Sequence, residues 1–451
     1  MHAVNATDRK PLRIVLTTFG SLGDLHPYIA IALGLQARGH EAVIGTSEHY
    51  RQKIEQLGIG FRPVRPDWPD PEEVPDFVRQ VMDLRKGGEF VLRQVVIPVL
   101  RDSYEDTLAA AEGADLLVSH ILTFTTRLVA EKKGIPWAST YLQPFAQFSV
   151  YDPPVLPPAP FLSKLRFLGP WLHRVVFWCA RQGVRSWCEP WHRLRAEIGL
   201  PPTSEHPLFE GMQSPWLVLS LFSECLAARQ PDWPPRTVLT GFPFYDRDGA
   251  EGMSAELQRF LDAGPPPLVF TLGSSAVLDA GSFYEQSALA AKLSGRRAVL
   301  LVGKETPNRP ASLPEGVAAF DYAPYSELFP RAAAIVHQGG IGTTAQAMRS
   351  GRPMLVMPYA HDQPDNAERV TRLGIARTIP RRRYTPERAA AALRDLLDNP
   401  AYAQRASEIG AKVREEDGVR VACDALERLL ESACVGSGGS AKSRQNTVDS
   451  R

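Results

Sequence analysis

Residues 334–367 read A-I-V-H-Q-G-G-I-G-T-T-A-Q-A-M-R-S-G-R-P-M-L-V-M-P-Y-A-H-D-Q-P-D-N-A, and this stretch decides the fold. The apolar run 334–336 predicts a buried strand, and the second run, 354–357, predicts the next parallel strand. Between them, residues 343–349 favour a helix that ends at Gly351. The stretch is therefore a strand–helix–strand unit, from which parallel sheets are built.

The turn after the first strand is rich in glycine. It contains His337, Gly339, Gly340 and Gly342, and Thr343 follows it. Glycines let the backbone approach a ligand closely, and the free N–H groups at the start of the next helix then point at that ligand. This geometry suits a diphosphate, with the histidine and the threonine as further donors. The alternative is that the glycines only form a tight turn between strand and helix.

The order of residues in this unit resembles the signature of the UDP-glycosyltransferase superfamily, H-x-G, then G-x-P, then P-x-x-x-D-Q-x-x-N-A. It is most similar to bacterial macrolide and antibiotic glycosyltransferases and to sterol glucosyltransferases, which carry H-x-G-G-x-G-T-T. The resemblance implies that the glycine-rich turn holds the diphosphate of a nucleotide sugar and that Asp362 and Gln363 bind the sugar hydroxyls. Plant members place a ribose-binding Glu eight residues after the His, where this chain has Ala345. The choice between UDP and dTDP therefore stays open.

The composition is that of an ordinary globular protein, with 44% hydrophobic and 22% charged residues in a chain of 451. The 51 basic and 50 acidic residues nearly balance, so charge gives no reason to expect nucleic-acid binding. The five cysteines are scattered without a C-x-x-C pair, which fits a reducing compartment. The N-terminus does not read as a signal peptide, and no apolar run reaches about 18 residues. We expect a cytoplasmic protein without a transmembrane segment.

Strands and helices alternate along the chain, which predicts an α/β fold with parallel sheets. Further buried strands are expected at 13–18, 40–46, 60–64, 115–119, 137–140, 216–220, 267–272 and 297–303. The resemblance implies the GT-B architecture, in which two Rossmann-like domains face each other across a cleft. With a linker at 230–236 or slightly after it, we predict an acceptor-binding domain over 1–235, a nucleotide-sugar-binding domain over 236–434 and a disordered tail over 435–451. The helical region 401–432 is long enough to pack back across the boundary.

The loop after the first strand, 19–27, reads F-G-S-L-G-D-L-H-P and places Asp24 at the start of a helix. Helix capping is the simple interpretation of an aspartate there. The resemblance implies another, because the family places its general base three residues before the proline of this loop, and Asp24 has that position. Inverting glycosyl transfer needs a base for the acceptor hydroxyl and N–H donors for the departing diphosphate.

His120 is the predicted partner of Asp24. An ordinary aspartate, with a pKa near ~3.9, is a poor base at neutral pH, so burial or a partner must raise the pKa. His120 follows the strand 115–119, where many family members place the aspartate that supports a catalytic histidine, and it could also act as base or relay. A structural histidine at a strand end is the alternative. His26, one turn along the helix, is the spare candidate.

Other positions in the second domain bear on the donor site. Gly273 and Ser274, after a strand, resemble the family's phosphate-contacting loop, and Tyr322 stands where plant members stack a Trp on uracil. Asp246-x-Asp248 matches the D-x-D pattern of metal-dependent glycosyltransferases, but the pattern is short and lies near the linker. We expect a metal-independent reaction without a cofactor, and a solvated patch at 381–383.

Residues 151–200 are rich in proline and aromatic residues, among them Trp171, Trp178, Trp187 and Trp191. Packing against the sheet is the simple interpretation, and a wall for a lipophilic acceptor or a weak membrane-surface contact is the functional one. The sequence as a whole predicts transfer of a hexose, with UDP-glucose as first choice of donor, to a hydroxyl of a hydrophobic small molecule. A nucleotide-sugar 2-epimerase and a non-catalytic nucleotide-sugar-binding protein are the alternatives.

Overall fold

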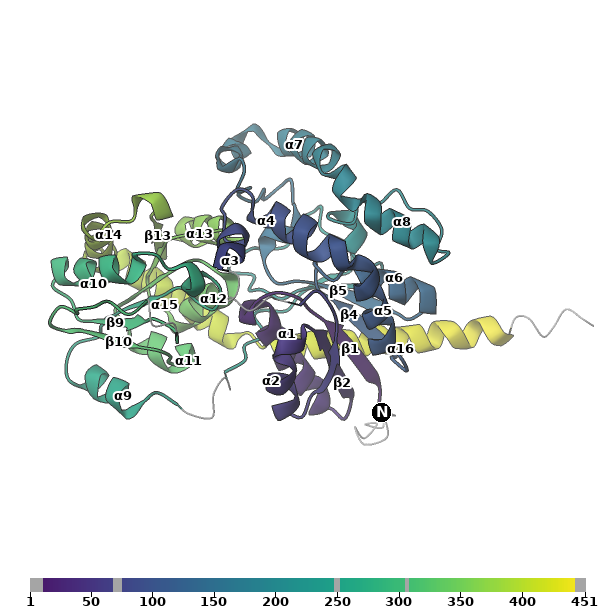
Figure 1. The fold of residues 1–451 in the computed structure, drawn as a ribbon, viewed down its shortest axis with the longest axis horizontal. Helices are drawn as coiled ribbons and strands as arrows, with labels where there is room; N and C mark the ends of the chain where they lie inside the picture. Colours follow the sequence, from purple (N-terminus) through teal and green to yellow (C-terminus); the bar gives the residue numbers. More distant parts are fainter. Residues whose placement is uncertain (1–10, 68–74, 247–251, 305–307, 443–451) are drawn as a thin grey trace, which may run out of the picture.

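The chain folds into two α/β domains that lie beside each other (Figure 1). The structure is a computed structural model, and it describes residues 11–67, 75–246, 252–304 and 308–442. Each domain is built on one parallel sheet, as the alternation of strands and helices predicts.

The first sheet has seven strands in the order β3-β2-β1-β4-β5-β6-β7. Its central strands consist of apolar residues that are buried on both faces, as is usual in parallel sheets covered by helices. The strands are β1 (Arg13–Thr17), β2 (Glu41–Thr46), β3 (Gly60–Pro63), β4 (Leu116–Ser119), β5 (Trp137–Tyr141), β6 (Leu217–Ser220) and β7 (Thr237–Leu239).

The second sheet has six strands in the order β10-β9-β8-β11-β12-β13. They are β8 (Leu268–Thr271), β9 (Ala298–Leu301), β10 (Val317–Phe320), β11 (Ala334–His337), β12 (Met354–Val356) and β13 (Ala376–Thr378). The strand–helix–strand unit predicted over 334–357 forms the neighbouring pair β11 and β12 in this sheet.

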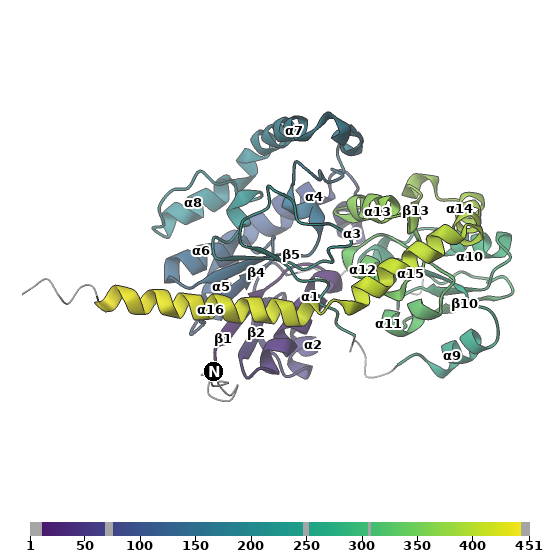
Figure 2. The ribbon, with the colours of Figure 1, turned by 180° about the vertical axis from the view of Figure 1, so that it is seen from behind.

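The helices cover both faces of the two sheets (Figures 1 and 2). In the first domain they are α1 (Leu22–Gln36), α2 (Arg51–Gln56), α3 (Pro75–Val81), α4 (Gly87–Phe90), α5 (Leu100–Ala110), α6 (Phe124–Lys133), α7 (Pro170–Gly183) and α8 (Glu189–Glu197). The second half of the chain adds α9 (Ala255–Asp262), α10 (Phe283–Leu293), α11 (Tyr325–Leu328), α12 (Ile341–Ser350), α13 (Gln363–Arg372), α14 (Pro386–Asp398), α15 (Pro400–Glu415) and α16 (Gly418–Lys442).

The domain boundary differs from the predicted division at 235 and 236. Strand β7 pairs with β6, so the first sheet continues to Leu239. Helix α16 then returns to the first domain, where Leu426 and other apolar residues pack against α1 (Figure 2). The first domain therefore includes α16, because the apolar face of that helix completes the core beside α1. The return of the last helical region across the boundary matches the expectation from its length.

The predicted disordered tail also differs in its starting point. Helix α16 continues to Lys442, past Val435, where the tail was expected to begin. Adding residues to an existing helix costs far less free energy than starting one, so a glycine-rich stretch can extend a packed helix. Residues 443–451 lie outside the described part of the chain.

In both sheets the strand order reverses beside the strand that starts the domain. Strand β1 lies between β2 and β4, and β8 lies between β9 and β11. Open parallel sheets bind ligands outside the carboxyl ends of the strands at such a reversal. The fold thus marks one candidate crevice in each domain.

Candidate active site

The reversal in the first sheet brings Asp24 and His120 together. Asp24 lies in the first turn of α1, just after β1, and His120 directly follows β4, the parallel neighbour of β1. The Nε2 atom of His120 is 3.7 Å from Oδ1 of Asp24. Two residues far apart in the sequence therefore form one polar pair at the carboxyl edge of the sheet.

The capping interpretation of Asp24 holds as well. Its Oδ2 atom accepts a hydrogen bond from the backbone N–H of Ser21 at 2.8 Å, and Ser21 in turn accepts from Gly23, which makes a capping box. Gly20 has a φ of 141°, and a β-carbon there would lie 2.2 Å from Asp24 Oδ2. One carboxylate oxygen therefore fixes the loop, while the other faces His120.

Burial raises the pKa of Asp24 to about 6, although the hydrogen bonds from Ser21 work in the opposite direction. A general base is most effective when its pKa lies near the working pH, because it is then ionised and still able to take a proton. The buried position of the carboxylate thus gives Asp24 the raised pKa that a general base needs at neutral pH.

His120 is neutral in this arrangement, and its Nε2 atom has no hydrogen-bond partner among the described residues. Its Nδ1 accepts the backbone N–H of Leu122 at 3.4 Å, so the ring proton belongs on Nε2, the atom that faces Asp24. Burial lowers the pKa of His120 to about 3. A positioning role for His120 fits this geometry better than the predicted role as base or relay. The spare candidate, His26, packs instead against the ring of Tyr245, with 5.3 Å between ring centroids.

We expect His120→Ala to lower kcat/KM by about 10- to 100-fold, because catalytic hydrogen bonds that are long in the free enzyme tighten in the substrate complex, and a hydrogen bond to a charged group contributes about 1.5–3 kcal/mol. The loss should appear in kcat rather than in the KM for the donor, since His120 faces the base. His120→Gln, whose amide can still donate, is the matched control and should recover part of the rate. Steady-state kinetics with near-normal rates for His120→Ala would remove this residue from the site.

The reversal in the second sheet brings the glycine-rich loops together. Gly273 and Ser274 follow β8, and the glycine-rich turn follows β11, its parallel neighbour. Helix α12 begins at this turn, and its N-cap residue, Gly340, makes no side-chain capping bond. The first N–H groups of α12 are therefore available to an anion, which the positive end of the helix dipole also favours. Thr343, in this turn of the helix, shares a hydrogen bond with the hydroxyl of Tyr325.

The structure assigns the histidine of this loop a different place from the predicted one. His337 is fully buried, its Nδ1 accepts the N–H of Gly339 at 3.0 Å, and its Nε2 faces Met354. Burial lowers the pKa of His337 to about 3, so the ring is neutral. The expectation that His337 donates to the diphosphate does not fit this position, because the ring lies behind the loop and holds its turn.

Gln338 occupies the place expected for His337, and the sequence analysis missed it. A β-carbon on Gly273 would lie 2.3 Å from the amide nitrogen of Gln338, and one on Gly340 would lie 2.8 Å from it. The amide thus fills the space between the two loops. Its oxygen is buried without a hydrogen-bond partner in the described part of the chain. In the sequence, its position between His337 and the pair Gly339-Gly340 could have indicated Gln338 as a site residue.

Asp362 and Gln363 follow β12, the next strand of the same sheet, so their loop adjoins the glycine-rich turn. The amide nitrogen of Asn366 donates to Asp362 at 2.6 Å, and Gln363 uses its carbonyl oxygen to accept the N–H of Tyr359 at 2.8 Å. The amide nitrogen of Gln363 is then the group that it can offer to a sugar. His361 has a left-handed φ of 56°, an uncommon conformation that fixes the direction in which the chain enters α13.

The two halves of the site meet where α1 and α12 begin. A β-carbon on Gly342 would lie 3.9 Å from the Cα of Gly23, so the two helix N-termini touch. Burial raises the pKa of Asp362 to about 7; a hydrogen bond from Asn366 opposes this increase, and the negative charge of Asp24 adds to it. The carboxylates of the two domains are therefore close enough to interact electrostatically.

Some predicted residues lie outside this group. Tyr322 is 51% exposed beyond the end of β10, and Ser274 is exposed on its loop. Asp246 of the D-x-D pattern binds the guanidinium of Arg349 at 2.7 Å, and Arg247 and Asp248 lie outside the described residues. Arg381, expected in a solvated patch, instead lies over the ring of Tyr359 and pairs with Asp279.

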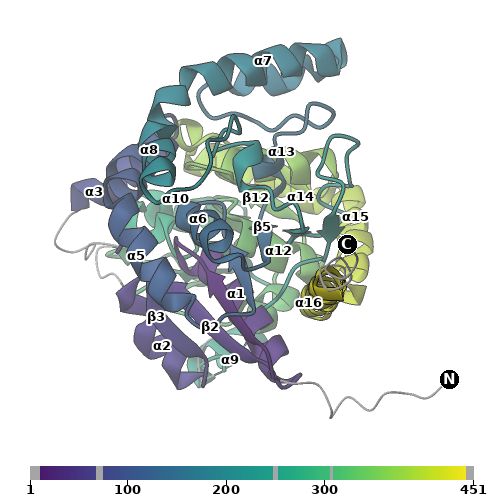
Figure 3. The same ribbon diagram turned by 90° about the vertical axis from the view of Figure 1, so that its right-hand side faces the viewer.

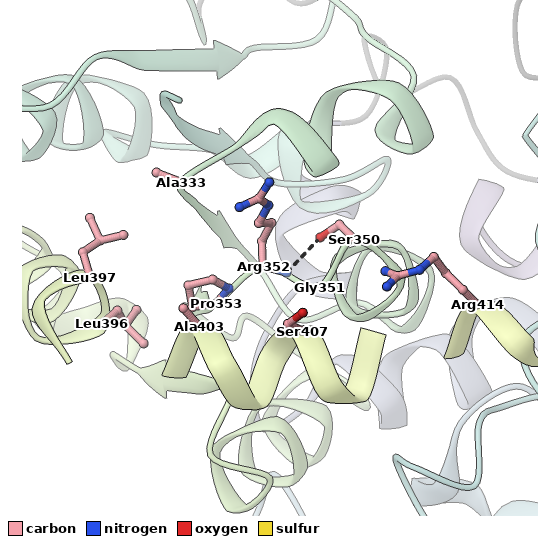
Figure 4. Close-up of a pocket in the computed structure, with 10 residues that line it drawn as sticks. All are labelled: Ala333, Ser350, Gly351, Arg352, Pro353, Leu396, Leu397, Ala403, Ser407 and Arg414. Carbon is pink, nitrogen blue, oxygen red and sulfur yellow. Dashed lines mark hydrogen bonds between the residues drawn. The ribbon is translucent and has the colours of Figure 1, made fainter. Parts of the chain in front are cut away.

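A cavity of about 270 Å³ lies at the other end of α12 (Figure 4). Ser350 and Gly351 line it, about 15 Å along the helix from the glycine-rich turn. The two arginines on its wall, Arg352 and Arg414, already donate to the carbonyl oxygens of Pro330 and Arg349. This cavity is separate from the site between the domains.

Comparison with known proteins gives the same two-part division. Residues 14–150 match the glycosyltransferase family 28 N-terminal domain, and residues 295–420 match the erythromycin biosynthesis protein CIII-like C-terminal domain. An O-mycaminosyltylonolide 6-deoxyallosyltransferase from Streptomyces fradiae is 34% identical over 436 residues, which cover 93% of this chain and 98% of that protein. A sterol 3-beta-glucosyltransferase from Cryptococcus neoformans var. neoformans serotype D is 29% identical over 458 residues, covering 94% of this chain but 27% of that larger protein.

Solved structures share the fold across almost the whole chain. A calicheamicin glycosyltransferase superposes with a TM-score of 0.70 at 18% identity, covering 94% of this chain and 99% of its own. A kitacinnamycin glycosyltransferase superposes with a TM-score of 0.67 at 24% identity, covering 93% and 99%. At these identities the likeness is one of fold, with two domains that are each built on a parallel sheet.

Proposed function

Because the chain belongs to the GT-B glycosyltransferases, in the branch of the macrolide and sterol enzymes, we propose that it transfers a hexose from a nucleoside diphosphate sugar to a hydroxyl of a lipophilic small molecule, with inversion and without a metal ion. The single observation that carries the proposal is the position of Asp24. Its raised-pKa carboxylate lies at the start of α1, which touches the uncapped start of α12. A base and an anion site therefore face one space from two domains.

The reaction follows from these two positions. Asp24 takes the proton of the acceptor hydroxyl while the oxygen forms a bond to the anomeric carbon of the sugar. The bond from that carbon to the diphosphate oxygen breaks on the opposite side, which inverts the configuration. The N–H groups of α12 and the amide nitrogen of Gln338 donate to the departing diphosphate and stabilise its charge. Asp362 and Gln363 hold the sugar.

The identity of the sugar donor is a more specific part of the proposal. The sequence favours UDP-glucose, and a dTDP-linked 6-deoxyhexose is the second candidate. Two observations favour the second: Ala345 stands where plant members have a ribose-binding glutamate, and the 34% identical relative is named a 6-deoxyallosyltransferase. The acceptor class, a sterol, polyketide, terpenoid or flavonoid, is the one that the macrolide and sterol relatives favour.

A nucleotide-release assay tests the function. UDP-glucose, UDP-GlcNAc, dTDP-glucose and a dTDP-6-deoxyhexose are each offered with a panel of hydrophobic acceptors, with EDTA and with Mn²⁺. Acceptor-dependent release that survives EDTA supports the transferase, and the donor with the highest kcat/KM identifies the nucleotide. Release only with Mn²⁺ would overturn the metal-independent part. Donor turnover without an acceptor would favour the epimerase, and tight nucleotide binding without turnover would favour the binding protein.

The pH dependence of kcat/KM should show an acidic limb with a midpoint near pH 6. Asp24 works as a base only when it is deprotonated, and burial raises its pKa to about 6, so activity is present above this pH and is lost below it. The measurement is kcat/KM between pH 4.5 and 9, with circular dichroism as a control for folding. Full activity down to pH 4.5 would mean that the base has an ordinary carboxylate pKa.

A further inference from the structure

Residues 160–188 form an arm on the outside of the first domain. It consists of the 3₁₀ segment Pro160–Leu168, helix α7 and the short 3₁₀ turn Arg185–Cys188. Helix α7 is the outermost element at the top of the molecule in Figures 1 and 3, and no other described element lies beyond it there. A large flat surface could therefore reach this helix without obstruction.

The solvent face of α7 is apolar. Trp171, Val175 and Trp178 recur at spacings of one and two helical turns, and both tryptophans are more than 60% exposed, at 63% and 62%. The preceding 3₁₀ segment adds Phe161, Phe167 and Leu168, all of them exposed. A surface helix ordinarily turns its polar side to water, whereas α7 exposes large apolar side chains to solvent. Contiguous exposed apolar surfaces mark contact sites.

The charge of the arm has a single sign. Residues 153–188 contain no Asp or Glu and carry Lys164, Arg166, Arg174, Arg181 and Arg185. Arg181 pairs with Glu210, and Arg166 lies close enough to Asp152 to interact with its charge. Lys164, Arg174 and Arg185 are exposed beside the apolar face. Basic residues around exposed tryptophans are the combination that binds the interface of a membrane with anionic lipids.

We propose that the arm docks the enzyme on the surface of an anionic phospholipid bilayer. The tryptophans and Phe167 enter the interfacial region, and the exposed basic side chains contact the lipid phosphates. The arm lies on the surface and does not cross the bilayer, since no helix in the described ranges is long and apolar enough to span one. The inference stands whichever sugar and acceptor the enzyme uses.

A bilayer fits this face better than the other possible occupants. Two copies of the chain joined through the arm would bring two acid-free, basic surfaces together, because a twofold contact pairs each patch with itself. An acidic protein would match the charge. The exposed apolar residues, however, belong to the outermost helix and to the segment before it, where a lipid interface can reach them (Figure 3).

The arm is also connected to the second domain through the segment before it. The segment that leads into it is tied to α13, because the N–H of Val155 donates to Asp365 at 2.9 Å and Asp152 pairs with Arg372 at 3.1 Å. Asp362, which we propose to hold the sugar, is the N-cap residue of the same helix. The segment that leads into the docked arm is thus connected directly to the helix that carries Asp362.

Vesicle co-sedimentation of the full chain tests the proposal. We expect binding to vesicles of phosphatidylcholine with phosphatidylserine, and at least about tenfold weaker binding to phosphatidylcholine alone. The double variant Trp171→Ser with Trp178→Ser should bind the anionic vesicles at least about tenfold more weakly. Lys164→Gln with Arg174→Gln should weaken binding by about fivefold per charge removed. Trp216→Ser is the matched control, because this tryptophan is also exposed, at 43%, but lies outside the arm.

Three outcomes would overturn the proposal. Absence of binding to anionic vesicles would do so directly. Equal binding by the tryptophan variant and the Trp216→Ser control would show that the arm is not the docking face. A dimer, seen by light scattering, that the tryptophan variant dissociates while vesicles stay unbound would assign the face to a second copy. Circular dichroism and thermal unfolding of each variant establish that it is folded.

Discussion

Asp24→Asn should lower kcat by about 10²–10⁴-fold, the range that a positioned general base contributes. The amide cannot take the proton of the acceptor hydroxyl. It keeps an oxygen that can accept the N–H of Ser21, so the capping box and the start of α1 are retained. Folding and donor binding should therefore stay close to those of the unchanged protein. Steady-state turnover together with calorimetric binding of the nucleoside diphosphate separates the two effects.

Asp246→Asn is the matched control for this substitution. Asp246 is also an aspartate near the domain junction, but it pairs with Arg349, away from the start of α1. We expect it to retain most of the turnover, and a large loss would restore the D-x-D pattern as part of the mechanism. Turnover by Asp24→Asn within about threefold of normal would show that another group is the base, and loss of nucleotide binding would show a structural rather than a chemical defect.

Arg369→Met should lower the free energy of unfolding by about 3–5 kcal/mol, the cost of removing one partner from a buried ion pair. Arg369 is 2% exposed and pairs with Asp365 at 2.7 Å within α13 and with Asp152 from the first domain. Methionine has a similar length but no charge, so it leaves the buried Asp365 without its cation. Urea unfolding followed by circular dichroism at pH 7.5 measures the loss.

Arg372→Met is the matched control, because it removes the same charge from the same helix. Arg372 contacts Asp152 at 3.1 Å but its side chain is 39% exposed, and an exposed ion pair contributes about 0–1 kcal/mol. The contrast between the two variants isolates the effect of burial. A loss of less than about 1 kcal/mol for Arg369→Met would show that the buried charges do not depend on this arginine.

Burial explains which strands could be predicted from the sequence and which could not. The central strands are continuous apolar runs buried on both faces, and such runs can be recognised directly in the sequence. Strands β7, β10 and β13 were not predicted, and each lies at the edge of a sheet. Their residues are partly exposed, as in Thr237–Leu239 and Ala376–Thr378, so they lack the apolar run that identifies a buried strand.

The site residues also divide into those that local sequence patterns predict and those that they do not. The glycine-rich turn, Asp24, Asp362 and Gln363 are short-range patterns, and their places at strand ends follow from the strand–helix alternation. The sequence could not predict that Gln338, and not His337, lies between the two glycine-rich loops. Successive residues leave a strand on opposite sides, and only the packing around Met354 and Gly273 decides which of the two faces the loop.

The sequence by itself determined two parallel α/β domains, a glycine-rich turn at a helix start in the second and an acidic residue at the start of the first helix, because hydrophobic periodicity and glycine spacing are local properties of the chain. The tertiary structure alone decided which residues from distant segments meet. It placed His120 beside Asp24, returned α16 to the first domain and buried Arg369 between two aspartates from different domains. These contacts depend on strand order and on the docking of the domains, which no local pattern records.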